Sequence, residues 1–109
     1  MTNSEEEEIF KFSYEVIDII NGLDHPDRRR ILEVIINSDK GKLTWEEIRQ
    51  KTGYIPENLN FNLEYLSKCG LIYHYENIDN LRKNIKIGYY ALSPRARRFI
   101  RKLITIFDF

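Results

Sequence analysis

Two amphipathic helical patterns, joined by a short third one, limit most strongly what this chain can fold into. The first begins at Pro26, a residue that suits the opening position of a helix, and its apolar residues recur on one face as far as Asn37. The second covers Pro56 to Lys68 and is followed by Gly70, which accepts the left-handed conformation that ends many helices. Its leucines, spaced for burial on one side, are Leu59, Leu63 and Leu66. Together the patterns predict a helix-turn-helix.

The short helix between these two has a clear start. Thr44 and Glu47 have the spacing of a capping box, in which each side chain bonds the backbone N–H of the other residue. A helix through about Lys51 should follow, and Lys42 and Leu43 just before it could add a short strand.

Beyond Gly70 the pattern changes from helix to strand. Residues 71–75 and 85–92 are rich in β-forming residues, and the polar connector 76–84 lies between them. Two such strands predict a hairpin. The expected fold is therefore mainly α with a small β-hairpin, a winged helix-turn-helix in the order α-α-(β)-α-α-β-β-α.

Each end of the chain predicts a further helix with an apolar face. Ser4 can cap a helix over residues 4–22, and Ser93-Pro94 opens one over residues 94–109. A peripheral helix this apolar must be covered, and a second copy of the chain is the simplest cover. We expect residues 1–109 to form one domain, with a core of 24–92 between two dimerisation helices. The expected dimer residues are Ile9, Phe12, Val16, Ile19, Ile20, Phe99, Leu103, Ile104 and Phe107.

Composition narrows the class of protein. A chain of 109 residues with 42% hydrophobic and 31% charged residues is typical of a soluble globular domain. The acidic run from Glu5 to Glu8 does not resemble a secretory signal, so we expect a cytoplasmic protein. The single cysteine, Cys69, excludes an internal disulfide and a cysteine-based metal cage.

Charge is distributed unevenly along a chain whose formal net charge is zero. Residues 1–24 carry a net charge of −6, and residues 71–109 carry +5. A zero net charge counts mildly against nucleic-acid binding, but a polarised chain can still turn a basic face to phosphates. The two charged segments could equally pair with each other, including across a dimer.

Three short motifs occur in a recognisable order. They are His25-Pro26-Asp27-Arg28 leading into Ile31-Leu32, the helix end from Leu66 to Ile72, and the strand end Leu92-Ser93-Pro94. In this order and spacing the chain resembles winged-helix regulators of the ArsR (arsenic-repressor-like) type, especially archaeal members without a metal site. The resemblance covers about residues 23–98. It implies a homodimeric DNA-binding regulator of transcription, with residues 56–68 in the major groove and the wing on flanking DNA.

The resemblance also indicates which residues could touch double-stranded DNA. On the recognition helix, asparagines could pair with adenine and Phe61 could meet a thymine methyl, although an asparagine-rich composition also scatters such residues. The N-cap at Thr44 and the basic side chains of the wing could contact phosphates. The arginine run 28–30 could do so too, but intramolecular pairing is equally expected for two of its members. The expected DNA-binding residues are Thr44, Glu57, Asn58, Asn60, Phe61, Tyr65, Lys68, Arg82, Lys83 and Lys86.

Other functions find less support in the sequence. His25 and His74 lie in different elements without further ligands at metal spacing, and no nucleophile has an evident base. We therefore expect no enzyme activity, cofactor, metal or membrane. Two alternatives stay open: a winged helix that binds protein instead of DNA, favoured by Glu57 and Glu64, and a regulator with a small-ligand pocket. The tyrosines of the hairpin, residues 73, 75, 89 and 90, are expected to pack in the core.

Overall fold

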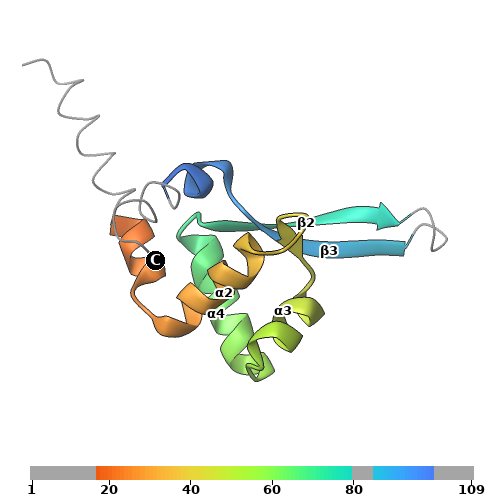
Figure 1. The fold of residues 1–109 in the computed structure, drawn as a ribbon, viewed down its shortest axis with the longest axis horizontal. Coiled ribbons are helices and arrows are strands. Elements are labelled where there is room, and N and C mark those ends of the chain that lie inside the picture. Colours follow the sequence, from red (N-terminus) through yellow and green to blue (C-terminus); the bar gives the residue numbers. More distant parts are fainter. Residues whose placement is uncertain (1–16, 80–84, 100–109) are drawn as a thin grey trace, which may run out of the picture.

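A computed structural model describes residues 17–79 and 85–99 of the chain (Figure 1). Residues 17–23 and 94–99 are helical. The elements between them are α2 (Pro26–Ile36), β1 (Lys42–Leu43), α3 (Trp45–Thr52), α4 (Pro56–Lys68), β2 (Ile72–Asp79) and β3 (Ile85–Leu92). The predicted order of helices and strands is confirmed within these residues.

Local signals at the ends of the helices act as expected. In α2 the N-cap is His25, whose Nδ1 accepts a hydrogen bond from the backbone N–H of Asp27 at 3.1 Å. Thr44 forms the predicted capping box with Glu47 at the start of α3. The turn between α3 and α4 begins at Gly53, whose φ of 72° is in the left-handed region that glycine adopts without strain.

The three strands form an antiparallel sheet in the order β1-β3-β2. One sequence prediction is wrong here, because β2 runs to Asp79 and not to Tyr75. Residues 76–79 continue the ladder with β3, where Glu76 pairs with Gly88 and Asp79 with Ile85. The backbone supplies these pairs whatever the side chains are, so polar residues extend the strand into solvent. The result is a long hairpin that projects from the helices (Figure 1).

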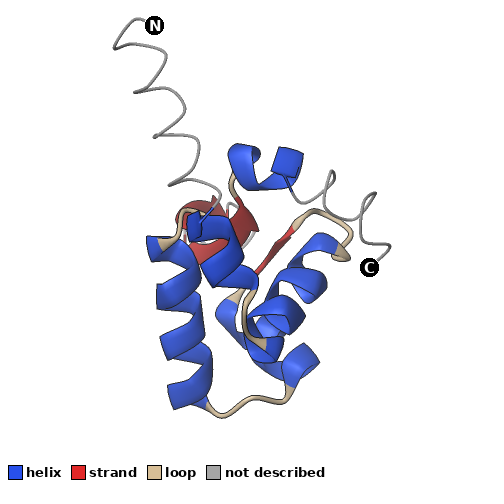
Figure 2. Ribbon diagram, turned by 90° about the vertical axis from the view of Figure 1, so that its left-hand side faces the viewer, coloured by secondary structure: helices blue, strands red, loops and turns tan. Residues whose placement is uncertain are grey.

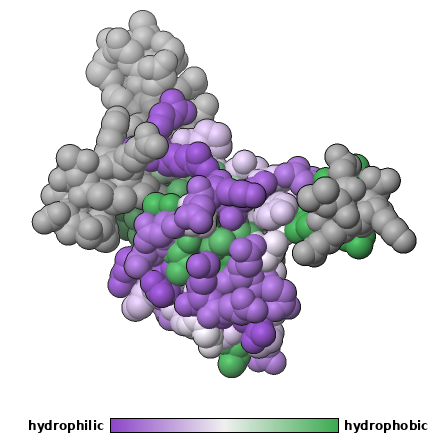
Figure 3. Space-filling model, turned by 45° about the vertical axis from the view of Figure 1, so that its right-hand side comes forward, coloured by the Kyte–Doolittle hydropathy of each residue, from purple (hydrophilic) through white to green (hydrophobic). Residues whose placement is uncertain are grey.

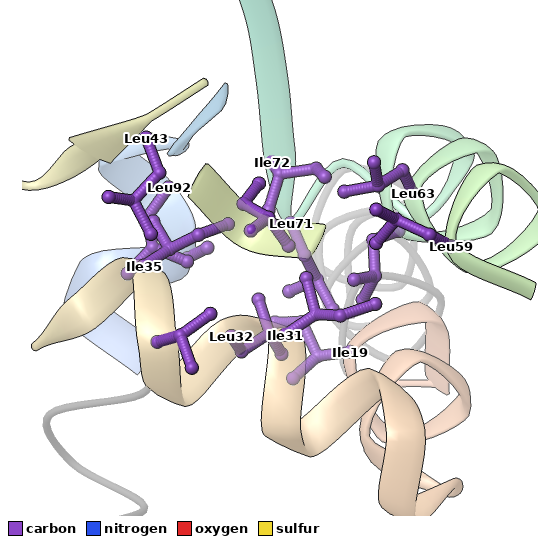
Figure 4. Packing of buried hydrophobic residues seen from close by; sticks show 14 residues of the cluster. Ile19, Ile31, Leu32, Ile35, Leu43, Leu59, Leu63, Leu71, Ile72 and Leu92 are labelled. Atoms are coloured by element: carbon purple, nitrogen blue, oxygen red, sulfur yellow. The ribbon is translucent and has the colours of Figure 1, made fainter. Parts of the chain in front are cut away.

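Helices α2, α3 and α4 gather on one side of the hairpin, as the view along it shows (Figure 2). Their buried faces meet one face of the sheet in a single aliphatic core, in which Leu71 and Ile72 of the hairpin contact the helices (Figure 4). Burying each such side chain stabilises the fold by about 1.5–3 kcal/mol. The largest fully buried side chains are Ile31, Ile35, Ile48, Leu59, Leu66 and Leu71.

Ile19 is placed differently from our expectation. Its side chain is only 5% exposed and packs into the core of its own chain beside Ile31 (Figure 4). It therefore has little surface to offer a second subunit, and the expectation that placed it in a dimer interface needs correction. The next residue, Ile20, is 57% exposed. Within the described residues, no helix has the length and apolar character needed to cross a membrane.

Candidate nucleic-acid interface

The outward face of α4 is the predicted recognition surface. Helical spacing puts its exposed residues in one stripe along the helix, opposite the buried leucines. Phe61 stands out, because a large apolar ring is 63% exposed there. The first three residues of α4 come before any buried side chain, so the start of the helix is accessible. The exposed positions that carry functional groups are Glu57, Asn60, Phe61, Glu64, Ser67 and Lys68.

Asn58 lies at the edge of this face and uses its amide inside the protein. Its Nδ2 donates to the Asp27 carboxylate at 3.1 Å, and its Oδ1 accepts a hydrogen bond from Asn62. Bidentate pairing with adenine needs both ends of the amide. The structure therefore gives Asn58 a different task from the expected one, which is to fasten α4 to the start of α2. Asn62 is buried and completes this network through the backbone carbonyl of Asn58.

The same junction holds a partly buried phenol, that of Tyr54. The pKa of Tyr54 is raised by its burial first and then by its hydrogen bond to Asp27. Tyr54, Asp27 and Asn58 thus form one polar cluster that joins α2 to the residues on either side of Pro56. A protonated Tyr54 supports this cluster throughout the physiological pH range.

Tyr65 is half-buried beneath an arginine instead of standing free for DNA. The guanidinium of Arg28 lies 4.2 Å from the centre of its ring. Arg28 also donates from Nε to the carbonyl of Gly22 and from Nη2 to that of Asn21, both at 3.0 Å. These carbonyls end the helix of residues 17–23, so Arg28 caps that helix and links it to α4.

The other two members of the arginine run are also engaged within the chain. Arg29 donates to the carbonyl of Leu23 at 2.7 Å, and Arg30 pairs with Glu33 at 3.0 Å. Intramolecular bonding, which the sequence left open for two of the three, thus accounts for the whole run.

Asn60 and Lys68 are exposed but have neighbours that orient them. The indole N–H of Trp45, the first residue of α3, donates to Oδ1 of Asn60 at 2.8 Å. Lys68 pairs with Glu64 one turn earlier at 3.2 Å, which neutralises the one basic side chain on this helix. Thr44 uses its hydroxyl to cap α3. The face therefore offers directed polar groups and an exposed ring, and its two glutamates and one lysine give it a net charge of −1.

The wing provides the second part of the candidate site. Lys86 is exposed on β3, and Arg82 and Lys83 lie outside the described residues. Near the far end of the hairpin, Ile78 and Ile85 are 59% and 56% exposed, and hydrophobic surface is visible there (Figure 3). A tip that mixes apolar and basic side chains is suited to contact with DNA grooves.

Two tyrosines of the hairpin form a surface row that the sequence did not reveal. The rings of Tyr73 and Tyr75 stack with centroids 5.3 Å apart, and Tyr75 meets Tyr89 across the strands at 5.8 Å. Lys42 lies 4.3 Å from the Tyr89 ring centre. Our expectation of core packing is wrong for Tyr73, which is exposed, and fits Tyr90, whose pKa is raised by burial. Alternation along β2 was the available signal, since residues 73 and 75 share one face.

Helices α2, α3 and α4 with the hairpin define a winged helix-turn-helix, and comparison with solved structures agrees. BigR from Xylella fastidiosa, a transcriptional repressor, is 25% identical, covers 98% of this chain and 97% of its own, and has a TM-score of 0.67. A homodimeric winged helix-turn-helix DNA-binding domain, Mb0332 from Mycobacterium bovis, is 17% identical over 99% of this chain and 88% of its own, with a TM-score of 0.68.

HlyU from Vibrio cholerae is 17% identical over 91% of this chain and 98% of its own, with a TM-score of 0.66. Mb0332, which is described as a possible ArsR-family regulator, shares with this chain the winged-helix fold that the sequence predicted. No protein-family model matches the chain, and no curated protein matches it in sequence. In the part of the chain that the structure describes, no three His, Cys, Asp or Glu side chains gather as a metal site would require.

Proposed function

We propose that this protein is a sequence-specific, double-stranded DNA-binding regulator of transcription that acts as a homodimer. The observation that carries the proposal is the exposed stripe on α4 beside a projecting hairpin, in a fold shared over nearly its whole length with the repressor BigR. A helix fits the major groove, which is about 12 Å wide, and the wing then reaches the flanking DNA. The homodimeric assembly described for Mb0332 supports a dimer.

We assign the contacts with DNA bases to residues in the first half of α4. Glu57 can accept a hydrogen bond from the amino group of cytosine, Asn60 can donate, and the Phe61 ring can contact a thymine methyl. Asn58 and Tyr65, which the sequence also suggested as contacts, instead support the helix from within through Asp27 and Arg28.

Phosphate binding falls to other parts of the molecule, because α4 has one lysine and that lysine is paired with Glu64. We assign it to Lys86 with Arg82 and Lys83 of the wing, and to the N-terminus of α3 at Thr44. About three phosphates per chain, or roughly six per dimer, would be neutralised in this arrangement.

Fluorescence anisotropy tests the proposal. A labelled duplex from upstream of the protein's own gene is titrated at several salt concentrations, with a scrambled duplex of equal composition as the control. We expect at least about tenfold tighter binding to the upstream duplex, and log affinity that falls linearly with log salt with a slope of roughly −3 to −6. Equal, weak binding to both duplexes would contradict the proposal and favour a winged helix that binds protein.

A further inference from the structure

We infer that Trp45 fixes the amide of Asn60 so that only hydrogen-bond donors face the DNA, and that Asn60 therefore reads a keto base, guanine or thymine. The inference rests on the proposed function and names one base-reading contact within it. It replaces the adenine pairing that the asparagines of α4 first suggested.

The geometry joins two helices at the centre of the candidate site. Trp45 opens α3 and is partly buried against the core, which holds its indole in place. Asn60 lies on the exposed stripe of α4, and its Oδ1 is 2.8 Å from the indole Nε1. One side chain is thus held by packing, and the other is exposed at the reading surface and bonded to it.

The chemistry of the indole decides which end of the amide faces outward. An indole N–H can donate a hydrogen bond but cannot accept one. The atom next to it must therefore be the amide oxygen, because a flipped amide would set N–H groups against each other. The two hydrogens on Nδ2 are left pointing away from Trp45, and among the described residues they have no bonding partner.

Donors that face the major groove select bases by their acceptors. Guanine offers O6 and N7, and thymine offers O4, whereas cytosine presents an amino donor and adenine pairs an amino donor with N7. Bidentate pairing with adenine would need Oδ1 of Asn60 to face the base together with Nδ2, but the bond from Trp45 holds that oxygen toward the indole. Asn58 cannot take over the task, since both ends of its amide are bonded inside the protein.

Selection of bound duplexes from a random library tests the inference without a known operator. Asn60→Asp is the decisive variant, because one carboxylate oxygen can keep the bond to Trp45 while the other turns the outward donor into an acceptor. Ser67→Asp, at another exposed position of α4, is the matched control for added negative charge. Trp45→Phe removes the indole N–H and so frees the amide of Asn60. The melting temperature of this variant shows whether it folds. If it does not fold, the comparison of Asn60→Asp with Ser67→Asp tests the inference without it.

The wild type should prefer guanine or thymine by about fivefold at one position of each half-site, equivalent to one net hydrogen bond. Asn60→Asp should move that preference to adenine or cytosine, Trp45→Phe should admit adenine, and Ser67→Asp should lower recovery without changing the preferred bases. A clear motif that is the same in the wild type and Asn60→Asp, or a wild-type preference for adenine or cytosine at every contacted position, would overturn the inference alone. No enriched motif for the wild type would overturn the proposed function as well.

Discussion

Single residues of this protein show how a basic run can serve the fold instead of a ligand. Arg28 is nearly buried, forks across two backbone carbonyls and covers the ring of Tyr65. Its location at the start of α2 is evident in the sequence, but its partners are not. The carbonyls lie six and seven residues earlier, and Tyr65 lies on another helix, so only the folded chain brings them together.

Arg28→Ala should lower the free energy of unfolding by about 2–4 kcal/mol, because the buried bond to the Gly22 carbonyl, the partly buried bond to the Asn21 carbonyl and the contact with the Tyr65 ring are all lost. Arg28→Lys keeps the positive charge but lacks the forked guanidinium that donates to both carbonyls, so it should recover only part of the lost free energy of unfolding. Arg30→Ala is the control, since its exposed pair with Glu33 contributes roughly 0.5 kcal/mol or less. Urea denaturation gives the three values. Equal stability of Arg28→Ala and Arg30→Ala would refute the capping role.

At the scale of elements, local signals account for most of the fold. Caps at residues 44 and 47, the glycines at 53 and 70 and the spacing of leucines in α4 are short-range features, and each element they predict is present. The length of β2 was underestimated because its polar end is paired by backbone bonds alone. The candidate site was harder to predict. The Asp27–Asn58 bond spans 31 residues and the Trp45–Asn60 bond spans 15, so tertiary packing decides which asparagine is free.

The wing provides a prediction at this scale. If the hairpin binds phosphate through Lys86, then Lys86→Ala should reduce the magnitude of the salt slope by about 0.9 for each chain, or roughly two for a dimer. Affinity should fall similarly for specific and scrambled duplexes, because phosphate contacts carry no base information. Lys40→Ala, in the turn before β1, is the control and should leave the slope unchanged. Fluorescence anisotropy over a series of salt concentrations measures the salt slope of each variant. A slope unaltered by Lys86→Ala would remove that residue from the interface.

In the whole molecule, the two terminal helical segments lie at the end opposite the wing (Figure 1). On the segment of residues 17–23, Ile17 and Ile20 are exposed while Ile19 enters the core. We propose that a second chain covers this exposed side. Pairing at this end would leave both wings outermost, as a symmetric dimer on two half-sites requires. The other expected dimer residues, apart from the partly buried Phe99, lie outside the described part of the chain.

The central claim is that two copies of this chain bind one duplex together, and sedimentation equilibrium tests it most directly. The protein is measured alone and with its selected duplex, alongside Ile20→Glu, which puts a charge on the proposed dimer surface. We expect two chains per duplex for the wild type. The variant should keep its fold, dissociate at least about tenfold more readily and bind the duplex correspondingly more weakly. One wild-type chain per duplex, or a complex unaffected by Ile20→Glu, would contradict this account of the dimer, and no complex at all would contradict the DNA-binding function.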